Sequence, residues 1–375
     1  MRKLKVCLLI VGILFLYSCG GDKNELPKDK PTGKVDNSVK KTVTCTDFVP
    51  ELMPNPEAFE TVVEPFEVQG PTGNTIYGMT RRPDPAKYPD LCFPAVVLVP
   101  GGINPGRLLA YGRDAEVLAG SGMIVATFNA EGRVDDSPED LRSEGAEDFN
   151  GFRQQEGLCA VVKCVMEMPG VYAENVGISS QSYGITMAAG CAGRHPEIGI
   201  KYIVDGEGPP NSFVTCHGAR FLGGDMAKYE TVKKIFDRLA TWQDGSQENR
   251  EWWAEREAIQ FIGDFKGYYV RLQAEWDHAQ PPENPSQLTD YNHPNGWPGG
   301  GPAWWHNKHT ADIVNAAVAG CVPWVRVNLP QQGNLVNAAY GEEDMPVFLP
   351  GELADKPWAV WAILEMAQMD ALNRD

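Results

Sequence analysis

The stretch Asn175-Val-Gly-Ile-Ser-Ser-Gln-Ser-Tyr-Gly-Ile-Thr-Met-Ala-Ala-Gly190 decides how the rest of the chain is interpreted. Its apolar start predicts a strand at 176–178, and the small residues at its end predict a helix. The turn between them would hold the Ser182 hydroxyl at a helix N-terminus, where backbone N–H groups favour developing negative charge. Ser180 and Gly184, two residues to either side, are small enough for a sharp turn. The stretch predicts a nucleophile elbow, the alternative being an ordinary serine-rich turn.

Apolar runs typical of buried strands alternate with helical patterns on both sides of this stretch. The strands are expected at Phe93–Val99, Met123–Phe128, Ile200–Asp205, Gly267–Glu275 and Val322–Leu329, and the helices at Arg107–Gly120, Phe152–Met168, His309–Gly320 and Asp355–Leu372. Segments 60–69 and 75–82 flank a Gly-Pro-Thr-Gly-Asn turn and predict a hairpin at a sheet edge. The alternation predicts an α/β fold with a doubly wound, mostly parallel sheet.

The segment at about 209–263 interrupts this alternation with two predicted amphipathic helices. An insertion here would lie above the C-terminal edge of the sheet, where such folds bind ligands, so we expect a helical lid. Its tryptophans, Trp242, Trp252 and Trp253, either line a pocket or pack the lid onto the body.

The N-terminus has the pattern of an export signal. Residues 1–18 combine a basic start with an apolar run that is too short for an ordinary membrane span. The sequence Leu16-Tyr-Ser-Cys19 resembles the lipobox of bacterial lipoproteins, which implies a lipid on Cys19 and a place in the bacterial cell envelope. Residues 19–44 are polar and predict a flexible tether, followed by one domain over 45–375.

The net charge of the chain limits the kinds of partner that it is expected to bind. The formal net charge of −17 becomes −20 when the signal segment is removed, because that segment holds three of the 33 basic residues and no acidic one. This balance argues against nucleic acid and anionic membrane surfaces as partners. We expect a small-molecule or peptide substrate, and contact with the membrane only through the lipid anchor.

Seven cysteines remain after Cys7 leaves with the signal and Cys19 carries the lipid. Cys45 and Cys92 flank the first strands and form the most plausible disulfide. Three others lie in apolar stretches and are expected to be buried thiols; these are Cys159, Cys191 and Cys321. No spacing typical of zinc ligands is present, and we expect neither a metal nor a cofactor.

Three motifs together resemble the α/β-hydrolase fold family: the elbow at Ser182, the strand end Leu98-Val-Pro-Gly-Gly102, and Glu275-Trp-Asp-His-Ala-Gln-Pro281. The resemblance implies that Ser182 is the nucleophile. It also implies that the oxyanion hole uses the N–H group of Tyr183 and one near Gly102 or Ile103. Asp277 matches the place of the family's catalytic acid, although it could be a solvated loop residue.

The chain departs from the family at the catalytic histidine. The loop in which the family has this residue ends here at Asn334, and no histidine follows His309. Asparagine cannot take a proton near neutral pH, so the base either comes from elsewhere or is missing. The possible bases are His278, His306 and His309. His195, at the end of the elbow helix, is expected only to cap that helix.

Four charged residues are expected at the C-terminal edge of the strands. Asp205 and Glu207 could supply an alternative acid or bind a ligand. The sequence assigns no role to Glu131 and Arg133. Two functions therefore remain. The first is a serine hydrolase acting on an ester or peptide bond. The second is a catalytically inactive envelope protein that keeps the fold and binds a ligand or partner.

Overall fold

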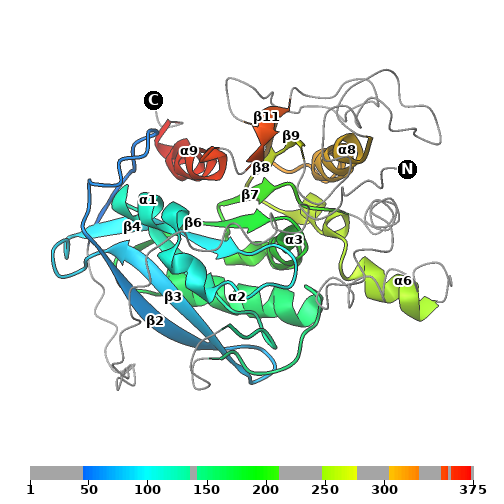
Figure 1. The fold of residues 1–375 in the computed structure, drawn as a ribbon, viewed down its shortest axis with the longest axis horizontal. Coiled ribbons are helices and arrows are strands. Elements are labelled where there is room, and N and C mark those ends of the chain that lie inside the picture. The colour runs from blue at the N-terminus through cyan, green and yellow to red at the C-terminus, as the bar shows by residue number, and fades with distance from the viewer. Residues whose placement is uncertain are drawn as a thin grey trace, which may run out of the picture.

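A central sheet with helices on both faces makes up the body of the protein (Figure 1). The computed structural model describes residues 45–135, 142–210, 247–276, 304–328, 348–353 and 356–372. In the described part of the chain the sheet has nine strands, and eight of them follow the order β10-β8-β7-β6-β4-β5-β3-β2, while β1 pairs with β4. Their bounds are β1 Thr46–Asp47, β2 Thr61–Gln69, β3 Thr75–Pro83, β4 Leu91–Val99, β5 Ile124–Phe128, β6 Val171–Gln181, β7 Tyr202–Gly206, β8 Tyr268–Leu272 and β10 Trp324–Val327.

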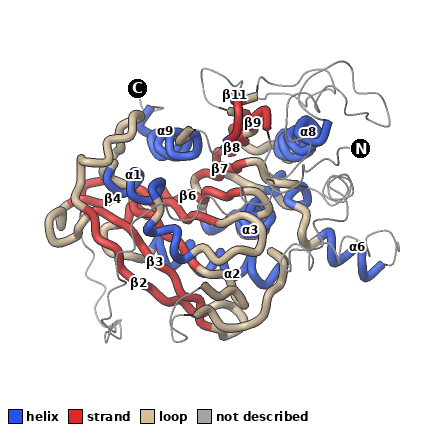
Figure 2. Tube along the Cα trace, viewed as in Figure 1, coloured by secondary structure: helices blue, strands red, loops and turns tan. Residues whose placement is uncertain are grey.

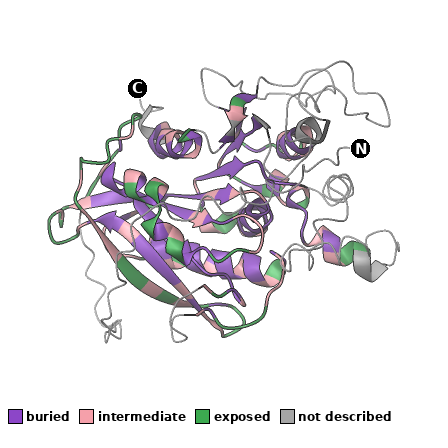
Figure 3. Cartoon of the chain, in the orientation of Figure 1, coloured by how far each residue is buried: buried purple, intermediate pink, exposed green. Residues whose placement is uncertain are grey.

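The sheet is mostly parallel, as the alternation of strands and helices predicted. Only β2 and β3 pair antiparallel, with each other and, for β3, with β5. The 60–69 and 75–82 hairpin is therefore confirmed, and it forms one edge of the sheet. The strands from β4 to β8 are almost entirely buried (Figure 3), because helices cover both of their faces.

Helices divide between the two faces and bury a separate core on each (Figure 2). On one face α2, α3 and α8 contribute to the first core, and on the other face α1 and α9 contribute to the second. The helix bounds are α1 Arg113–Gly120, α2 Phe152–Met166, α3 Gly184–Arg194, α6 Gln247–Ala254, α8 Trp304–Ala319 and α9 Trp358–Leu372. None of the helices in these described ranges is both long and apolar enough to cross a lipid bilayer.

Some elements differ in detail from the sequence-based expectation. The helix predicted over 107–120 is a 3₁₀ turn, Arg107–Tyr111, followed by α1, with an extended Gly112 between them. The strand predicted over 267–275 divides into β8 and β9 (Ala274–Trp276), and β9 pairs with β11 (Leu349–Glu352) in a separate small sheet. Of the expected lid, the structure describes α6 and two 3₁₀ turns, Ala258–Gln260 and Ile262–Asp264.

Two disulfides join elements that are distant in sequence. Cys45 and Cys92 are bonded, as predicted, and this bond holds the start of the domain against β4. The expectation that Cys159 and Cys191 are free thiols is wrong, because they form a second disulfide between α2 and α3. Cys321 is a free thiol but is exposed, since it lies just after the end of α8 rather than inside it. Two disulfides are typical of proteins outside the cytoplasm.

Candidate active site

Ser182 occupies a sharp turn between the end of β6 and the start of α3, at the C-terminal edge of the sheet. Its backbone has a φ of 50°, a conformation that residues with a side chain rarely adopt. The N–H of Ser182 donates a 2.7 Å hydrogen bond to the carbonyl of Gly206, which ties the turn to the neighbouring strand β7. The side chain remains half-buried. These features together are those of a nucleophile elbow.

The loop after β4 lies directly against this turn. A methyl group added at Gly101 would come within 3.0 Å of the Ser182 Cβ atom, and one added at Gly184 would come within 2.7 Å of the Pro100 carbonyl oxygen. Gly102 has a φ of 60°, which glycine adopts without strain. The glycines at these places therefore allow two backbone segments to approach closely. Ile103 follows in the same half-buried loop.

Asn150 connects the turn at Ser182 to the loop after β4, although the sequence analysis did not identify it as a site residue. Its Nδ2 atom donates hydrogen bonds to the carbonyl oxygens of Tyr183, at 2.8 Å, and Gly102, at 3.4 Å. Its Oδ1 atom accepts a hydrogen bond from Arg133 at 2.5 Å. Asn150 is fully buried, so this one side chain joins the elbow to the loop after β4 from inside the protein.

The backbone around Asn150 is strained. Phe149 has a φ of 53° and Asn150 has a φ of 61°, and each such residue costs on the order of 1–3 kcal/mol. Asparagine tolerates this conformation better than most residues, whereas phenylalanine does so rarely. The dipeptide Asn150-Gly151 was the one sequence signal for a turn here. Strain that is retained beside the Ser182 turn points to a functional constraint.

Aromatic side chains from the expected lid region pack beside the turn at Phe149 and Asn150. The ring of Trp252 lies 6.0 Å from that of Phe149 and 4.9 Å from that of Trp253, and the Arg256 guanidinium lies 4.0 Å from the Trp252 ring. Arg256 also pairs with Asp148 at 2.6 Å. Trp253 is buried and Trp252 half-buried, so both pack α6 onto the body of the protein. Trp242 lies outside the described residues.

Tyr183, the residue after Ser182, is also buried. Burial raises the pKa of its hydroxyl well above the usual value, and nearby Arg256 and Arg133 oppose that change only in part. The phenol therefore stays protonated at every physiological pH, so it cannot replace a missing histidine as the base.

A buried polar network lies at the same edge of the sheet, beyond the elbow. Arg271 on β8 donates to Asp205 on β7 and to the carbonyl of Gly208, both at 2.8 Å, and to Gln273 at 2.6 Å. The hydroxyl of Tyr269 donates to Asp205 at 2.8 Å. Both members of the ion pair are fully buried. Burial raises the pKa of the Asp205 carboxyl, while Arg271, Tyr269 and the N–H of Gly208 act in the opposite direction.

The remaining acidic residues at this edge have structural partners. Glu207 has a φ of 54° and is buried, and its carboxylate accepts a hydrogen bond from the N–H of Ala274 at 3.1 Å. Glu131 accepts hydrogen bonds from Thr72 and Asn74, and so holds the hairpin turn. Asp205 and Glu207 are thus built into the protein interior as supports of the strand edge.

Two histidine side chains lie within the described residues. His195 is the C-cap of α3, as predicted, and its backbone N–H donates to the carbonyl of Cys191 at 3.2 Å. Its ring contacts Glu156 at 2.7 Å and Glu197 at 3.2 Å. The 11 residues of α3 separate it from Ser182 by roughly 16 Å, so it is not a base for this serine. His309 is buried in the first turns of α8, and its neighbour Thr310 donates to Gln273, which follows β8.

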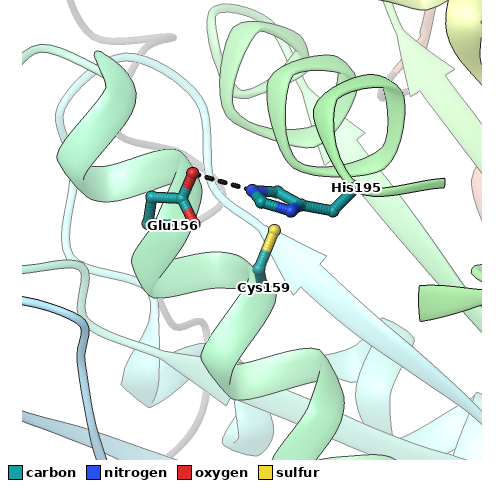
Figure 4. A group of neighbouring side chains, drawn as sticks. All are labelled: Glu156, Cys159 and His195. Carbon is teal, nitrogen blue, oxygen red and sulfur yellow. Dashed lines mark hydrogen bonds and ion pairs between the residues drawn. The ribbon is translucent and has the colours of Figure 1, made fainter. Parts of the chain in front are cut away.

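One group of possible metal ligands occurs among the described residues, away from the elbow. Atoms of Glu156, Cys159 and His195 lie within 4.8 Å of one another (Figure 4). However, the sulfur of Cys159 is bonded to Cys191 and so is no thiolate ligand. The carboxylate of Glu156 also forms an ion pair with the Arg194 guanidinium at 2.8 Å, which disfavours binding of a metal cation there. We therefore assign no metal to this group.

Several predicted site residues lie outside the described residues: Asp277, His278, Asn334 and Cys19. His306 belongs to α8, but its side chain is not among those described. The structure therefore brings together the predicted nucleophile Ser182 and the loop that contains Ile103. It leaves the acid and the base as predictions.

Comparisons with known proteins identify the fold. No protein-family model matches the sequence, and no curated protein matches it. Among solved structures, puromycin hydrolase superimposes with a TM-score of 0.53 at 13% identity, over 83% of this chain and 40% of its own. A candidate dipeptidyl aminopeptidase IV from Bacteroides ovatus ATCC 8483 superimposes with a TM-score of 0.50 at 15% identity, over 83% of this chain and 35% of its own. This chain thus spans less than half the length of either protein.

Proposed function

We propose that this protein, which has the α/β-hydrolase fold, is a serine hydrolase that cleaves an ester or peptide bond with Ser182 as nucleophile. The observation that carries the proposal is the strained, half-buried Ser182 in a strand-to-helix turn packed against a glycine loop. Such a turn exposes the hydroxyl to a substrate carbonyl, and α3 directs backbone N–H groups toward the charge that develops. The similar solved structures, among them a hydrolase and a peptidase, are consistent with this chemistry.

The oxyanion hole in this proposal uses the N–H groups of Tyr183 and Ile103. Asp277 is the catalytic acid, and the base is a relocated histidine: His278, His306 or His309. Of these, His309 is supported by its burial in α8 beside Thr310, which contacts the end of β8. An imidazole can act as the general base only within hydrogen-bond reach of the serine, which the histidine substitutions below test.

The proposal extends to the location of the protein. Residues 1–18 would be removed as a lipoprotein signal, Cys19 would carry the lipid, and residues 19–44 would tether the catalytic domain to the bacterial envelope. The segment at about 209–263 would form the lid. Growth with a radiolabelled fatty acid tests the anchor: label should appear in the wild-type protein and be absent from a Cys19→Ser variant.

A second function is favoured by one observation, Asn334 at the place where the family has its catalytic histidine. Under this alternative the protein binds a ligand or partner in the envelope and performs no chemistry. No histidine substitution would then affect its activity, because it would have none.

Labelling with a fluorophosphonate probe tests the hydrolase, since such probes react with serines made nucleophilic by their surroundings. We expect the wild-type protein to be labelled and Ser182→Ala to be unlabelled. Ser179→Ala is the matched control, because Ser179 is also half-buried and lies on the same strand. An unlabelled wild-type protein with a native circular dichroism spectrum would leave the binding function as the better explanation.

Alanine substitutions at His278, His306 and His309 then identify the base. One of the three should abolish labelling of Ser182 while the other two leave it unchanged. His195→Ala is the control, because that side chain lies at the far end of α3. Full labelling in all three variants would show that no histidine among them serves as the base.

A further inference from the structure

We propose that Asn150 is a positioning residue for the oxyanion hole, and this inference rests on the serine-hydrolase function proposed above. Asn150 lies between the two backbone segments that would supply the oxyanion donors. Its Nδ2 atom lies 3.4 Å from the carbonyl oxygen of Gly102 and 2.8 Å from that of Tyr183. One side-chain nitrogen thus sets the position of both segments relative to each other.

The contact with Gly102 determines the direction of a donor. The carbonyl of Gly102 and the N–H of Ile103 belong to the same planar peptide unit, and in a trans peptide they point in opposite directions. Because Asn150 holds the carbonyl oxygen, the Ile103 N–H is directed away from Asn150. On the other side of Ile103, Arg133 donates a hydrogen bond to the carbonyl of Asn104 at 3.5 Å. Ile103, the predicted donor, is thereby held from both sides.

The orientation of the Asn150 amide follows from its partners. The Arg133 guanidinium can only donate, so the atom 2.5 Å from it must be the amide oxygen. The carbonyl oxygens of Gly102 and Tyr183 can only accept, so the atom facing them must be the nitrogen. An asparagine therefore fits this place, whereas an aspartate would direct negative charge toward two carbonyl oxygens.

The backbone of Asn150 is held as firmly as its side chain. Its N–H donates to Gln154 Oε1 at 2.8 Å, and its carbonyl accepts from Gln155 Nε2 at 2.9 Å. Its φ of 61° is one that glycine and asparagine tolerate, but alanine does not. Asn150→Gly therefore removes the side chain without adding backbone strain, and Asn150→Asp keeps the shape and the Arg133 contact but removes the donor.

Asn175 provides a matched control. It is also a buried asparagine, and its Nδ2 atom donates to a backbone carbonyl, that of Ala367, at 2.7 Å. It lies on β6 seven residues before Ser182, or roughly 23 Å along an extended strand. Asn175→Ala removes a comparable hydrogen bond far from the proposed oxyanion hole.

The experiment measures the second-order rate of fluorophosphonate labelling, together with kcat and KM for a p-nitrophenyl ester. We expect Asn150→Gly and Asn150→Asp to reduce kcat and the labelling rate by about 10- to 100-fold, less than the loss of an oxyanion donor itself, with KM unchanged. Asn175→Ala should match the wild-type rate. In Asn150→Asp, the rate relative to the wild type should rise as pH falls, because the introduced carboxyl gains a proton that it can donate.

Each outcome decides between the possibilities. Wild-type kcat in both folded Asn150 variants overturns the inference alone, while an unreactive wild-type protein overturns the proposed function. If neither variant folds, as judged by circular dichroism, Asn150 is a structural residue and the inference is again overturned. If only one variant folds, a reduced kcat in that variant supports the inference and a wild-type kcat overturns it.

Discussion

Arg271→Met should destabilise the protein severely, because it leaves a buried carboxylate without its cation. Arg271 and Asp205 are both fully buried and lie 2.8 Å apart. The substitution also removes the donor to the carbonyl of Gly208 and to Gln273. Removing one partner of such a pair costs about 3–5 kcal/mol of unfolding free energy. At about 2 °C per kcal/mol for a chain of this size, the melting temperature should fall by about 6–10 °C.

The assay is urea denaturation followed by tryptophan fluorescence, with three further variants. Asp205→Asn should also destabilise the fold, because it leaves Arg271 without its anion. The double variant should lose at least 2 kcal/mol less than the sum of the two single losses, since neither charge is then left uncompensated. Arg81→Met, which breaks an exposed pair with Glu116, should cost only about 0–1 kcal/mol.

The loss in Arg271→Met should also depend on pH. Burial already raises the pKa of Asp205, and removal of the guanidinium raises it further. A carboxyl whose pKa is raised in the folded state favours folding only while it is protonated. The penalty is therefore small below about pH 4, the pKa of an unfolded aspartate, and grows as pH rises through the folded pKa. A loss under 1 kcal/mol at pH 8, or a strictly additive double variant, would refute this reasoning.

Three other outcomes follow from the same structure. Gly184→Val should abolish fluorophosphonate labelling, because the valine side chain would press on the loop after β4. It should also lower the free energy of unfolding, measured by urea denaturation, by about 1–3 kcal/mol. Labelling at the wild-type rate would contradict this. Replacing Cys159 and Cys191 by serine should cost about 3–4 kcal/mol in the same assay for a 32-residue separation, and an unchanged midpoint would count against the disulfide. Of the free cysteines described, Cys321 should react with Ellman's reagent in the native protein before Cys164, because Cys321 is exposed and burial raises the pKa of the Cys164 thiol; the reverse order would be inconsistent with this geometry.

Hydrophobic pattern was sufficient to predict the architecture. Continuous apolar runs marked β4 and β5, and a hairpin pattern marked β2 and β3, because burial on both faces or one face imposes a local sequence period. The sharp turn at Ser182 was predictable for the same reason, because the strand, the turn of small residues and the helix are adjacent in the chain.

Pairings between helices were not predictable in this way. Cys159 and Cys191 both lie in apolar helical segments, where a buried thiol and a disulfide have the same sequence pattern. Their bond depends on how α2 packs against α3, with Cα atoms 5.5 Å apart. Cys45 and Cys92 were paired correctly because both lie beside the first strands, which suggested that they are neighbours.

The sequence by itself determined the strand–helix order and the elbow, because hydrophobic periodicity and turn chemistry act over a few adjacent residues. Only the tertiary structure decided which polar groups meet at the C-terminal edge of the sheet. Asn150 reaches Gly102 and Tyr183 across 48 and 33 residues, and Asp205 meets Arg271 across 66 residues. Such contacts depend on strand register and on strained backbone at Asn150, and a hydrogen bond requires its atoms to lie within about 3.5 Å. No local pattern specifies positions to that accuracy.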